Sequence, residues 1–197
     1  MENKKILVTG SKGFLASNLL KYLDKCNDII LYDGDIRTHK QYHDIDTIIH
    51  FAGPSDDFDF KDSEKTITTI INGTINILKI VRHTNAKLIF ASTQGVQVPN
   101  NIYCYSKALM ERYIQDNYDN WVILRIPRVY DKMRKKGLMK KLRLKMVNKN
   151  DMFKNVEYIT LDSFINQTLK VVNQRNIIYN YNNIRVNTIR EIKDLYT

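Results

Sequence analysis

Cysteine is scarce in this sequence, and the scarcity excludes two kinds of scaffold. Cys26 and Cys104 are the only cysteines among 197 residues, and neither stands in a Cys-x-x-Cys pair or near a cluster of metal ligands. This spacing excludes a disulfide framework and a cysteine-based zinc site. We therefore expect two reduced thiols in a cytoplasmic protein that holds no metal.

Long apolar runs, internal repeats and low-complexity tracts are also missing. No stretch approaches the roughly 20 apolar residues that a membrane-spanning helix needs, and the first residues show no signal-peptide pattern. Hydrophobic residues still make up 43% of the chain, which is typical of a globular protein. We expect one compact domain with a sizeable core and no membrane segment.

Acidic residues are outnumbered by basic ones, and the formal net charge is +10. This balance favours anionic partners such as nucleotide cofactors, nucleotide-linked sugars or nucleic acids. Much of the excess lies in residues 132–149, whose apolar residues give an irregular helical face. This segment can be a solvated helix face, a substrate diphosphate clamp helped by Arg128, or a surface for nucleic acid or an acidic partner. Nucleic acid is the weaker choice, because no nucleic-acid-binding module accompanies the lysines.

Glycine is infrequent too, yet two glycines stand close together near the start of the chain. An aliphatic run over residues 6–8 ends in Thr9 and Gly10, and leucines recur at helical spacing after Gly13. This order of strand, glycine turn and helix opens dinucleotide-binding units, although an ordinary tight turn is the alternative. Gly10 allows the turn, Gly13 lets the backbone approach a pyrophosphate, and the helix N-terminus attracts phosphates.

The next predicted strand, residues 29–32, is followed by Asp33. An acid at this point commonly holds the adenosine ribose hydroxyls and disfavours a 2′-phosphate, so Asp33 favours NAD over NADP. Lys12 and Arg37 are nearby cations that can instead accept a phosphate, and NADP stays open. Asp33 and Asp35 can also be plain turn residues.

A further strand over residues 46–51 follows after about a dozen residues, near the minimum for a crossover with a short helix. His50 lies within this buried strand and is predicted to be a packed core residue rather than a catalyst. A long amphipathic helix over residues 62–83 comes next, and Gly73 marks close packing within it.

Two pairs of polar side chains follow the buried strand over residues 87–91. Ser92 and Thr93 stand at its carboxyl end, where open α/β sheets bind ligands. Tyr103 and Lys107 are four residues apart, so on a helix they share a face. A lysine ammonium beside a phenol lowers the pKa of the phenol, which can then act as a general acid or base. We expect a proton-transfer site here.

The remaining elements complete an α/β pattern. Further strands and helices are predicted over residues 121–124, 161–172, 177–179 and 188–196. We predict a Rossmann-type doubly wound parallel sheet, with a dinucleotide-binding core over residues 1–130 and a small cap over residues 131–197. The last strands interleave the two parts, so that the whole forms a single compact domain.

Taken together, these motifs resemble the extended short-chain dehydrogenases/reductases, and within them the NAD-dependent epimerase/dehydratase family that modifies nucleotide sugars. The matching stretches follow the family's order: residues 9–16, 34–37, 50–53, 73–78, 92–93, 103–107 and 124–130. The resemblance implies hydride exchange between NAD(P) and a carbon of a nucleotide-activated sugar. It also implies a possible homodimer through the helices over residues 62–83 and 103–118.

The resemblance implies a role for each matched residue. The resemblance places Gly10, Gly13, Phe14 and Leu15 at the pyrophosphate, Asp35 and Ile36 beside the adenine, and Ala52 and Gly53 at the nicotinamide-side ribose. The remaining predicted cofactor residues are Lys12, Asp33, Phe51, Tyr103 and Lys107. Tyr103 is the implied acid/base, and Lys107 holds ribose hydroxyls and tunes it. Thr93 is implied to hydrogen-bond the reacting sugar oxygen, with Ser92 as its neighbour. Arg128 is a further predicted substrate contact, through the diphosphate clamp considered above.

The chain also departs from the family pattern. Gln94 and Gly95 follow Thr93 where sugar dehydratases have an acidic pair, so dehydration is set aside. Arg128 replaces the usual asparagine, and the substrate lobe is cut back to about residues 130–197. Reduction and epimerisation both stay open. The alternative is a non-catalytic NAD(P)-binding protein that uses its basic surface to bind RNA or an acidic partner.

Overall fold

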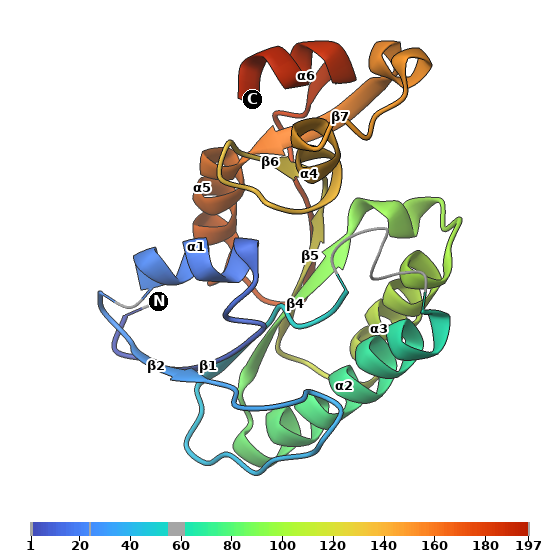
Figure 1. Ribbon diagram of the computed structural model, residues 1–197. Helices are drawn as coiled ribbons and strands as arrows, with labels where there is room; N and C mark the ends of the chain where they lie inside the picture. The colour runs from blue at the N-terminus through green and yellow to red at the C-terminus, as the bar shows by residue number, and fades with distance from the viewer. Residues whose placement is uncertain (1, 24, 55–61, 197) are drawn as a thin grey trace.

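A six-stranded parallel sheet forms the centre of the computed structural model, which describes residues 2–23, 25–54 and 62–196 (Figure 1). The strand order is β2-β1-β3-β4-β5-β8. The strands are β1 (Lys5–Thr9), β2 (Asp28–Leu31), β3 (Thr47–His50), β4 (Lys87–Thr93), β5 (Trp121–Ile126) and β8 (Ile177–Asn180). All six lie at positions that the sequence predicts.

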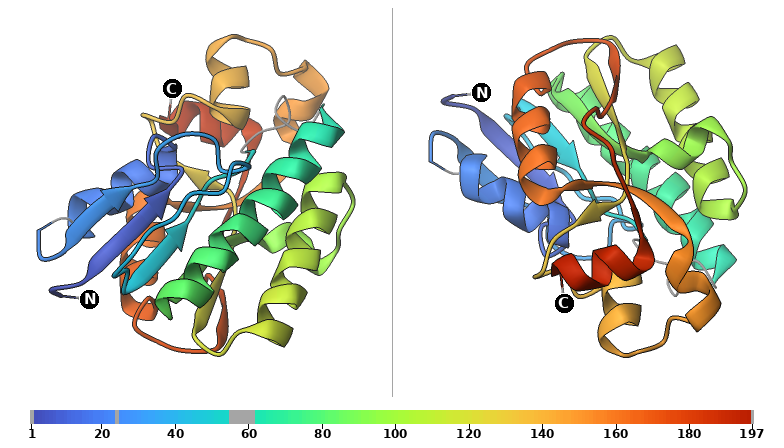
Figure 2. Two further views of the ribbon diagram at one scale, coloured as in Figure 1. Left: turned by 90° about the horizontal axis from the view of Figure 1, so that it is seen from below. Right: turned by 90° about the horizontal axis from the view of Figure 1, so that it is seen from above.

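Helices cover both faces of this sheet (Figure 2). On β1, Ile6 and Val8 pack toward α1 (Phe14–Leu23) and α5 (Leu161–Val171). Leu7 packs toward the opposite layer, formed by α2 (Ser63–Thr84) and α3 (Ile102–Asn117). Because both faces are covered, the central strands are continuous aliphatic runs rather than alternating ones. The predicted Rossmann-type doubly wound sheet is confirmed.

The order of the strands creates a crevice at one edge of the sheet. β2 lies on one side of β1 and β3 on the other, so the direction of strand addition reverses between them. Open parallel sheets bind ligands at the carboxyl ends of the strands flanking such a reversal. Residues 32–46 join β2 to β3 with neither helix nor strand, so even the expected short crossover helix is missing there.

Side-chain caps fix where the two helices beside this crevice begin. The Asp62 carboxylate accepts from the backbone N–H of Lys65 at the start of α2, and the Asn101 side chain accepts from that of Cys104 at the start of α3. Caps of this type satisfy amide groups that have no intrahelical partner. The cap at Asn101 therefore starts α3 early enough to include Tyr103.

A second sheet and two short helices form a cap above the crevice. The sheet contains β6 (Val129–Tyr130), β7 (Asn155–Thr160) and β9 (Arg185–Thr188). α4 (Gly137–Arg143) and α6 (Ile189–Tyr196) pack with it around Tyr130 and Tyr158, whose rings stack 5.0 Å apart. No helix in the part of the chain that the structure describes is long and apolar enough to cross a membrane.

The basic segment differs from its expected form. Within residues 132–149 only α4 is an α-helix, which ends before Lys145, a residue in the left-handed region at φ 54°. A single helical face over the whole segment is therefore wrong. The boundary at residue 130 stays a prediction, because α5 and β8 return to the large sheet after the cap has begun.

Candidate active site

The glycine turn lies directly against the end of β3. Gly10 has φ +68°, and a Cβ added to it would lie 2.7 Å from the amide nitrogen of Ala52 and 2.8 Å from the carbonyl carbon of Phe51. The Gly13 N–H donates to the Gly10 carbonyl at 2.8 Å, and α1 begins with Phe14. Only glycine fits at position 10. The turn therefore places the amide-rich end of α1 at the crevice, as a pyrophosphate site requires.

A buried hydrogen-bonded chain holds the ends of β1 and β3 together. The Thr9 hydroxyl lies 2.7 Å from His50 Nδ1 and accepts from the Ala52 N–H at 3.1 Å. His50 Nε2 lies 3.1 Å from the Thr74 hydroxyl. Burial, and secondarily Lys107, lowers the pKa of His50 to about 3, so the ring is neutral. His50 is a packed core residue, as its strand position predicts.

The acids after β2 differ in their surroundings. The Asp33 side chain is 94% exposed and lies 3.3 Å from the Lys40 ammonium, so it is open to a ribose. Asp35 accepts from Arg37, and these hydrogen bonds lower the pKa of Asp35 to about 2. Arg37 is thus engaged by Asp35. Ile36 is buried against Gly73, where an added Cβ would lie 2.8 Å from its side chain, and this leaves little besides backbone for the predicted adenine contact.

Lys107 reaches from α3 to the carboxyl ends of the strands. Its ammonium donates to the Ala91 carbonyl at 2.7 Å and lies 4.5 Å from the centroid of the Phe90 ring. It is also 3.9 Å from the position of a Cβ at Gly53. Burial lowers the pKa of Lys107 to about 7, although Glu111 opposes the change. The structure therefore brings Lys107 to the loop predicted to line the nicotinamide-side ribose.

Tyr103 lies one turn before Lys107 and is partly buried against the core. Burial raises the pKa of its phenol, Cys104 adds to the rise, and Arg134 opposes it. The pKa of Tyr103 is therefore raised overall, where the spacing of Tyr103 and Lys107 predicts a lowered one. The physical reason is that the same burial that keeps the phenol neutral also disfavours the charge on Lys107.

Ser92 and Thr93 end β4 on opposite sides. The Ser92 hydroxyl donates to the Glu111 carboxylate, which also accepts from Arg125 Nη2 at 2.7 Å. Ser92 and Glu111 are 3% and 2% exposed, so Ser92 is part of a buried network and its predicted substrate contact is not supported. The Thr93 hydroxyl accepts from the Gly95 N–H at 3.2 Å and is only half-buried at the strand end.

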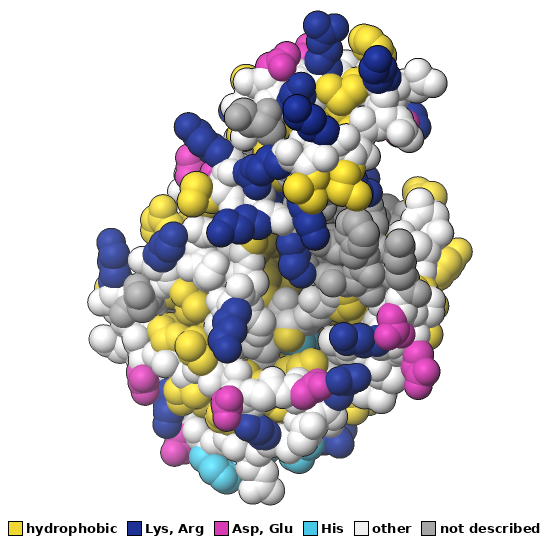
Figure 3. All heavy atoms as spheres, in the orientation of Figure 1, with side chains coloured by type: hydrophobic (Ala, Val, Ile, Leu, Met, Phe, Trp, Pro, Cys, Tyr) yellow, Lys and Arg dark blue, Asp and Glu magenta, His cyan; other side chains and the backbone are white. Residues whose placement is uncertain are grey.

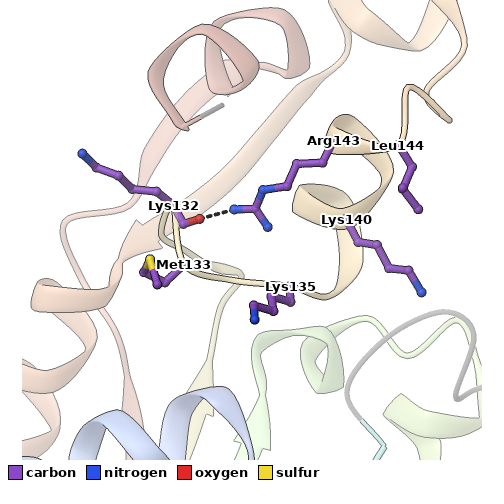
Figure 4. A pocket seen from close by; sticks show the side chains of 6 residues that line it. All are labelled: Lys132, Met133, Lys135, Lys140, Arg143 and Leu144. Carbon is purple, nitrogen blue, oxygen red and sulfur yellow. Dashed lines mark hydrogen bonds between the residues drawn. The ribbon is translucent and has the colours of Figure 1, made fainter.

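The basic segment lines a cavity of about 420 Å³ in the cap (Figure 4). Lys132, Met133, Lys135, Lys140, Arg143 and Leu144 line it. Arg143 reaches the carbonyls of Lys132 and Arg134. Figure 3 shows lysine and arginine side chains gathered over the cap and down toward the hollow below it. Arg128 is exposed but does not line this cavity. A diphosphate clamp formed by this cavity therefore does not include Arg128, which the sequence predicts as its helper.

Sequence reasoning missed three residues at the crevice. Glu111 lies one helical turn after Lys107 on α3, and this spacing could have placed it on the same face. Its partner Arg125 lies on β5, so local spacing does not indicate their pairing. Arg134 lies 5.5 Å from the centroid of the Phe14 ring, a contact that no local pattern indicates.

A glycine turn at a strand-order reversal, beside a helix N-terminus and a buried lysine, defines a dinucleotide-binding Rossmann-type protein. The backbone N–H groups at the start of α1, together with the close approach of the backbone at Gly10, fit a pyrophosphate. The family model described as "NAD dependent epimerase/dehydratase family" matches residues 6–163. The chain belongs to this family.

Individual relatives agree with this assignment. UDP-glucuronic acid decarboxylase 6 of Arabidopsis thaliana is 30% identical over 119 residues, which cover 48% of this chain and 35% of that protein. The chain therefore matches about a third of the length of this curated relative.

Solved structures share the fold at low identity. A UDP-N-acetylglucosamine 4-epimerase from Methanobrevibacter ruminantium, in complex with UDP-N-acetylmuramic acid, is 17% identical with a TM-score of 0.80, covering 99% of this chain and 81% of that one. A Thermus thermophilus UDP-glucose 4-epimerase in complex with NAD is 18% identical with a TM-score of 0.78, covering 96% and 81%.

Proposed function

We propose that this protein is an NAD(P)-dependent enzyme that reduces or epimerises a nucleotide-activated sugar. The observation that carries the proposal is the meeting of two distant segments at one crevice. Gly10 is pressed against Ala52, and the Lys107 ammonium lies 3.9 Å from a Cβ position at Gly53, one residue further along. The phosphate turn and the tyrosine–lysine helix thus face the same short loop after β3.

The cofactor's role is to accept and return a hydride. For the chain's own part, the turn over residues 10–13 and the start of α1 bind the pyrophosphate, with Lys12, Phe14 and Leu15 beside it. The exposed Asp33 carboxylate accepts hydrogen bonds from ribose hydroxyls and repels a 2′-phosphate, which favours NAD. Phe51, Ala52 and Gly53 border the nicotinamide-side ribose, which Lys107 holds.

Tyr103 is the proposed proton donor and acceptor. Its phenol is protonated near neutral pH and so carries a proton for a sugar oxygen during reduction, although burial, by raising the pKa of the phenol, makes it a weaker acid. We assign the hydrogen bond to that oxygen to the Thr93 hydroxyl, which is half-buried at the end of β4. In the opposite direction, when the sugar is oxidised, Tyr103 must accept a proton and therefore be deprotonated first. A nearby cation stabilises this phenolate form.

The substrate's diphosphate is proposed to bind the basic cavity of the cap. Lys132, Lys135, Lys140 and Arg143 line it without any carboxylate among the described lining residues. Arg134 and Arg143 hold the preceding loop through backbone carbonyls, so the cavity has a defined wall.

A homodimer through α2 and α3 is part of the proposal. Tyr105, Leu109 and Tyr113 recur every four residues along α3 and are 57%, 55% and 38% exposed. This apolar stripe suits a second copy of the same helix face. Sedimentation of wild type and Leu109→Glu tests it, with dissociation expected in the variant.

The direct test is mass spectrometry of the purified protein for co-purifying NAD(P) and a sugar nucleotide, followed by absorbance at the reduced nicotinamide band with keto-sugar nucleotides. Binding without any turnover, together with a salt-sensitive shift of RNA in a gel, would support the non-catalytic alternative instead.

A further inference from the structure

Two histidines that are far apart in the sequence meet at the surface of the protein. His43 lies in residues 32–46, which join β2 to β3, and His83 lies in the last turn of α2. His43 Nδ1 is 3.1 Å from His83 Nε2, while the ring centroids are 5.0 Å apart. The two nitrogens therefore face one another, and both residues are exposed to solvent.

The spacing of these nitrogens suits two ligands of one transition-metal ion. Zinc binds imidazole nitrogen at about 2.0–2.1 Å, so two nitrogens 3.1 Å apart subtend roughly 100° at a shared ion. This angle lies between the right angle of octahedral or square-planar sites and the tetrahedral angle. Without metal, one nitrogen donates a hydrogen to the other. When metal binds, that ring takes its other neutral tautomer, and both lone pairs face the ion.

The end of α2 adds a field that favours a cation. His83 is in the last turn of this helix, where the carbonyls carry a partial negative charge. The neighbouring Arg82 contacts a different group, since its guanidinium carbon lies 5.1 Å from the centroid of the Tyr118 ring. Imidazole suits zinc, copper and nickel, whereas Mg²⁺ takes oxygen ligands. The chemistry of the pair therefore selects a divalent transition metal.

We propose that His43 and His83 bind a divalent transition-metal ion of the zinc type, with water in the remaining coordination positions. Among the residues that the structure describes, no group of three His, Cys, Asp or Glu side chains could hold a metal, so the two imidazoles are the protein ligands. The expectation of a protein without metal rests on the cysteines, which take no part in this pair. The inference does not rest on the proposed function.

The bound ion fastens an irregular segment to a helix. Asn76, about two turns before His83 on α2, donates to the Arg37 carbonyl at 2.7 Å and anchors the first part of residues 32–46. The contact between His43 and His83 is a second anchor on the same helix. A ligand that binds only the folded state stabilises it, so bound metal should raise the unfolding temperature and slow local opening of this segment.

Isothermal titration calorimetry of the chain without an added histidine tag tests the inference, with ZnCl₂ as the probe and MgCl₂ as the negative comparison. One Zn²⁺ should bind per chain, and Mg²⁺ should give no binding heat. His43→Gln and His83→Gln should each raise the Kd for Zn²⁺ about tenfold or more, because even the loss of a partner that orients a ligand costs about 10–100-fold.

Two control variants separate this site from other surface ligands. His39→Gln removes an exposed imidazole from the same segment, and Cys26→Ser removes the exposed thiol. Both should bind Zn²⁺ with the wild-type Kd. Zn²⁺ should also raise the unfolding temperature of wild type and slow hydrogen exchange over residues 33–43, and EDTA should reverse both effects. His43→Gln should show neither effect, whereas a role as a hydrogen bond alone would produce no metal dependence even in wild type.

The inference is overturned if wild type gives no heat of binding with Zn²⁺, or if both histidine variants bind it with the wild-type Kd. Loss of binding in Cys26→Ser alone would assign the metal to the thiol instead. Binding that changes neither the unfolding temperature nor the exchange would show that the ion does not fasten the segment. The proposed function is tested separately, through NAD(P) binding and turnover.

Discussion

Glu111 and Arg125 form a buried ion pair between α3 and β5, in which Arg125 Nε and Nη2 donate to Oε2 at 3.0 and 2.7 Å. The Glu111 side chain is 3% exposed, and it also accepts from the Ser92 hydroxyl. This network fastens the helix that carries Tyr103 and Lys107 to two central strands.

Removing the carboxylate should therefore destabilise the protein strongly. Glu111→Ala leaves the Arg125 guanidinium without its partner in a mostly buried position, and an uncompensated buried charge costs about 3–5 kcal/mol. We expect that loss in the free energy of unfolding measured with urea. Asp116→Asn is the matched control, because it breaks an exposed pair with Arg112 and should cost no more than about 1 kcal/mol. Equal effects of the two changes would refute the role of the network.

Gly10 and Gly137 allow steric conflict to be separated from backbone strain. Both have positive φ, but an added Cβ meets Ala52 at Gly10 and meets nothing within 4 Å at Gly137. Gly137→Ala should cost only the strain of a left-handed residue, about 1–2 kcal/mol. Gly10→Ala should cost more and should weaken NAD binding. The NAD affinity of Gly137→Ala should match wild type. An unchanged NAD dissociation constant in Gly10→Ala would contradict the phosphate-turn assignment.

Local patterns predicted the strands, the glycine turn and the pairing of Tyr103 with Lys107, because each depends on residues close in sequence. The direction of Ser92 depends on Glu111, whose partner Arg125 comes from another strand, and no local signal indicates it. The same limit applies to β7 and β9, whose pairing joins distant short segments.

The spacing of Tyr103 and Lys107 predicts that the lysine lowers the pKa of the phenol, and the structure shows why spacing alone misleads. Sequence spacing places the two side chains on one face, but it does not report burial. Burial disfavours the charged form of both groups and sends the pKa of Tyr103 up and that of Lys107 down.

Cofactor preference tests Asp33. Its exposed carboxylate repels a 2′-phosphate, so Asp33→Asn should reduce the preference for NAD over NADP, measured as a ratio of dissociation constants, by roughly tenfold. Asp35→Asn is the comparison, since Asp35 is engaged by Arg37. If the ratio does not move in Asp33→Asn, Asp33 is only a turn residue.

Stability should depend on pH through Lys107. Burial lowers its pKa from the ordinary 10.5 to about 7 in the folded state. Between these values the unfolded chain binds more protons than the folded one, so the free energy of unfolding rises with pH. Below about pH 7 both states carry the proton and this slope disappears.

Lys107→Met should therefore flatten the rise in unfolding free energy between about pH 7 and pH 9, a window inside the shift of Lys107. Lys170→Met, at an exposed site on α5, should leave the slope as in wild type. Urea unfolding at several pH values measures both. A wild-type slope retained in Lys107→Met would show that Lys107 is charged in the folded protein.

The central claim is that the Tyr103 phenol transfers the proton, while the affinity for NAD(P) comes mainly from the other residues of the crevice. The most direct measurement compares Tyr103→Phe with wild type for NAD(P) binding and for turnover of a keto-sugar nucleotide. The account predicts an unchanged dissociation constant and a kcat lower by roughly a hundredfold to ten-thousandfold. Turnover that persists at the wild-type rate in Tyr103→Phe would contradict it.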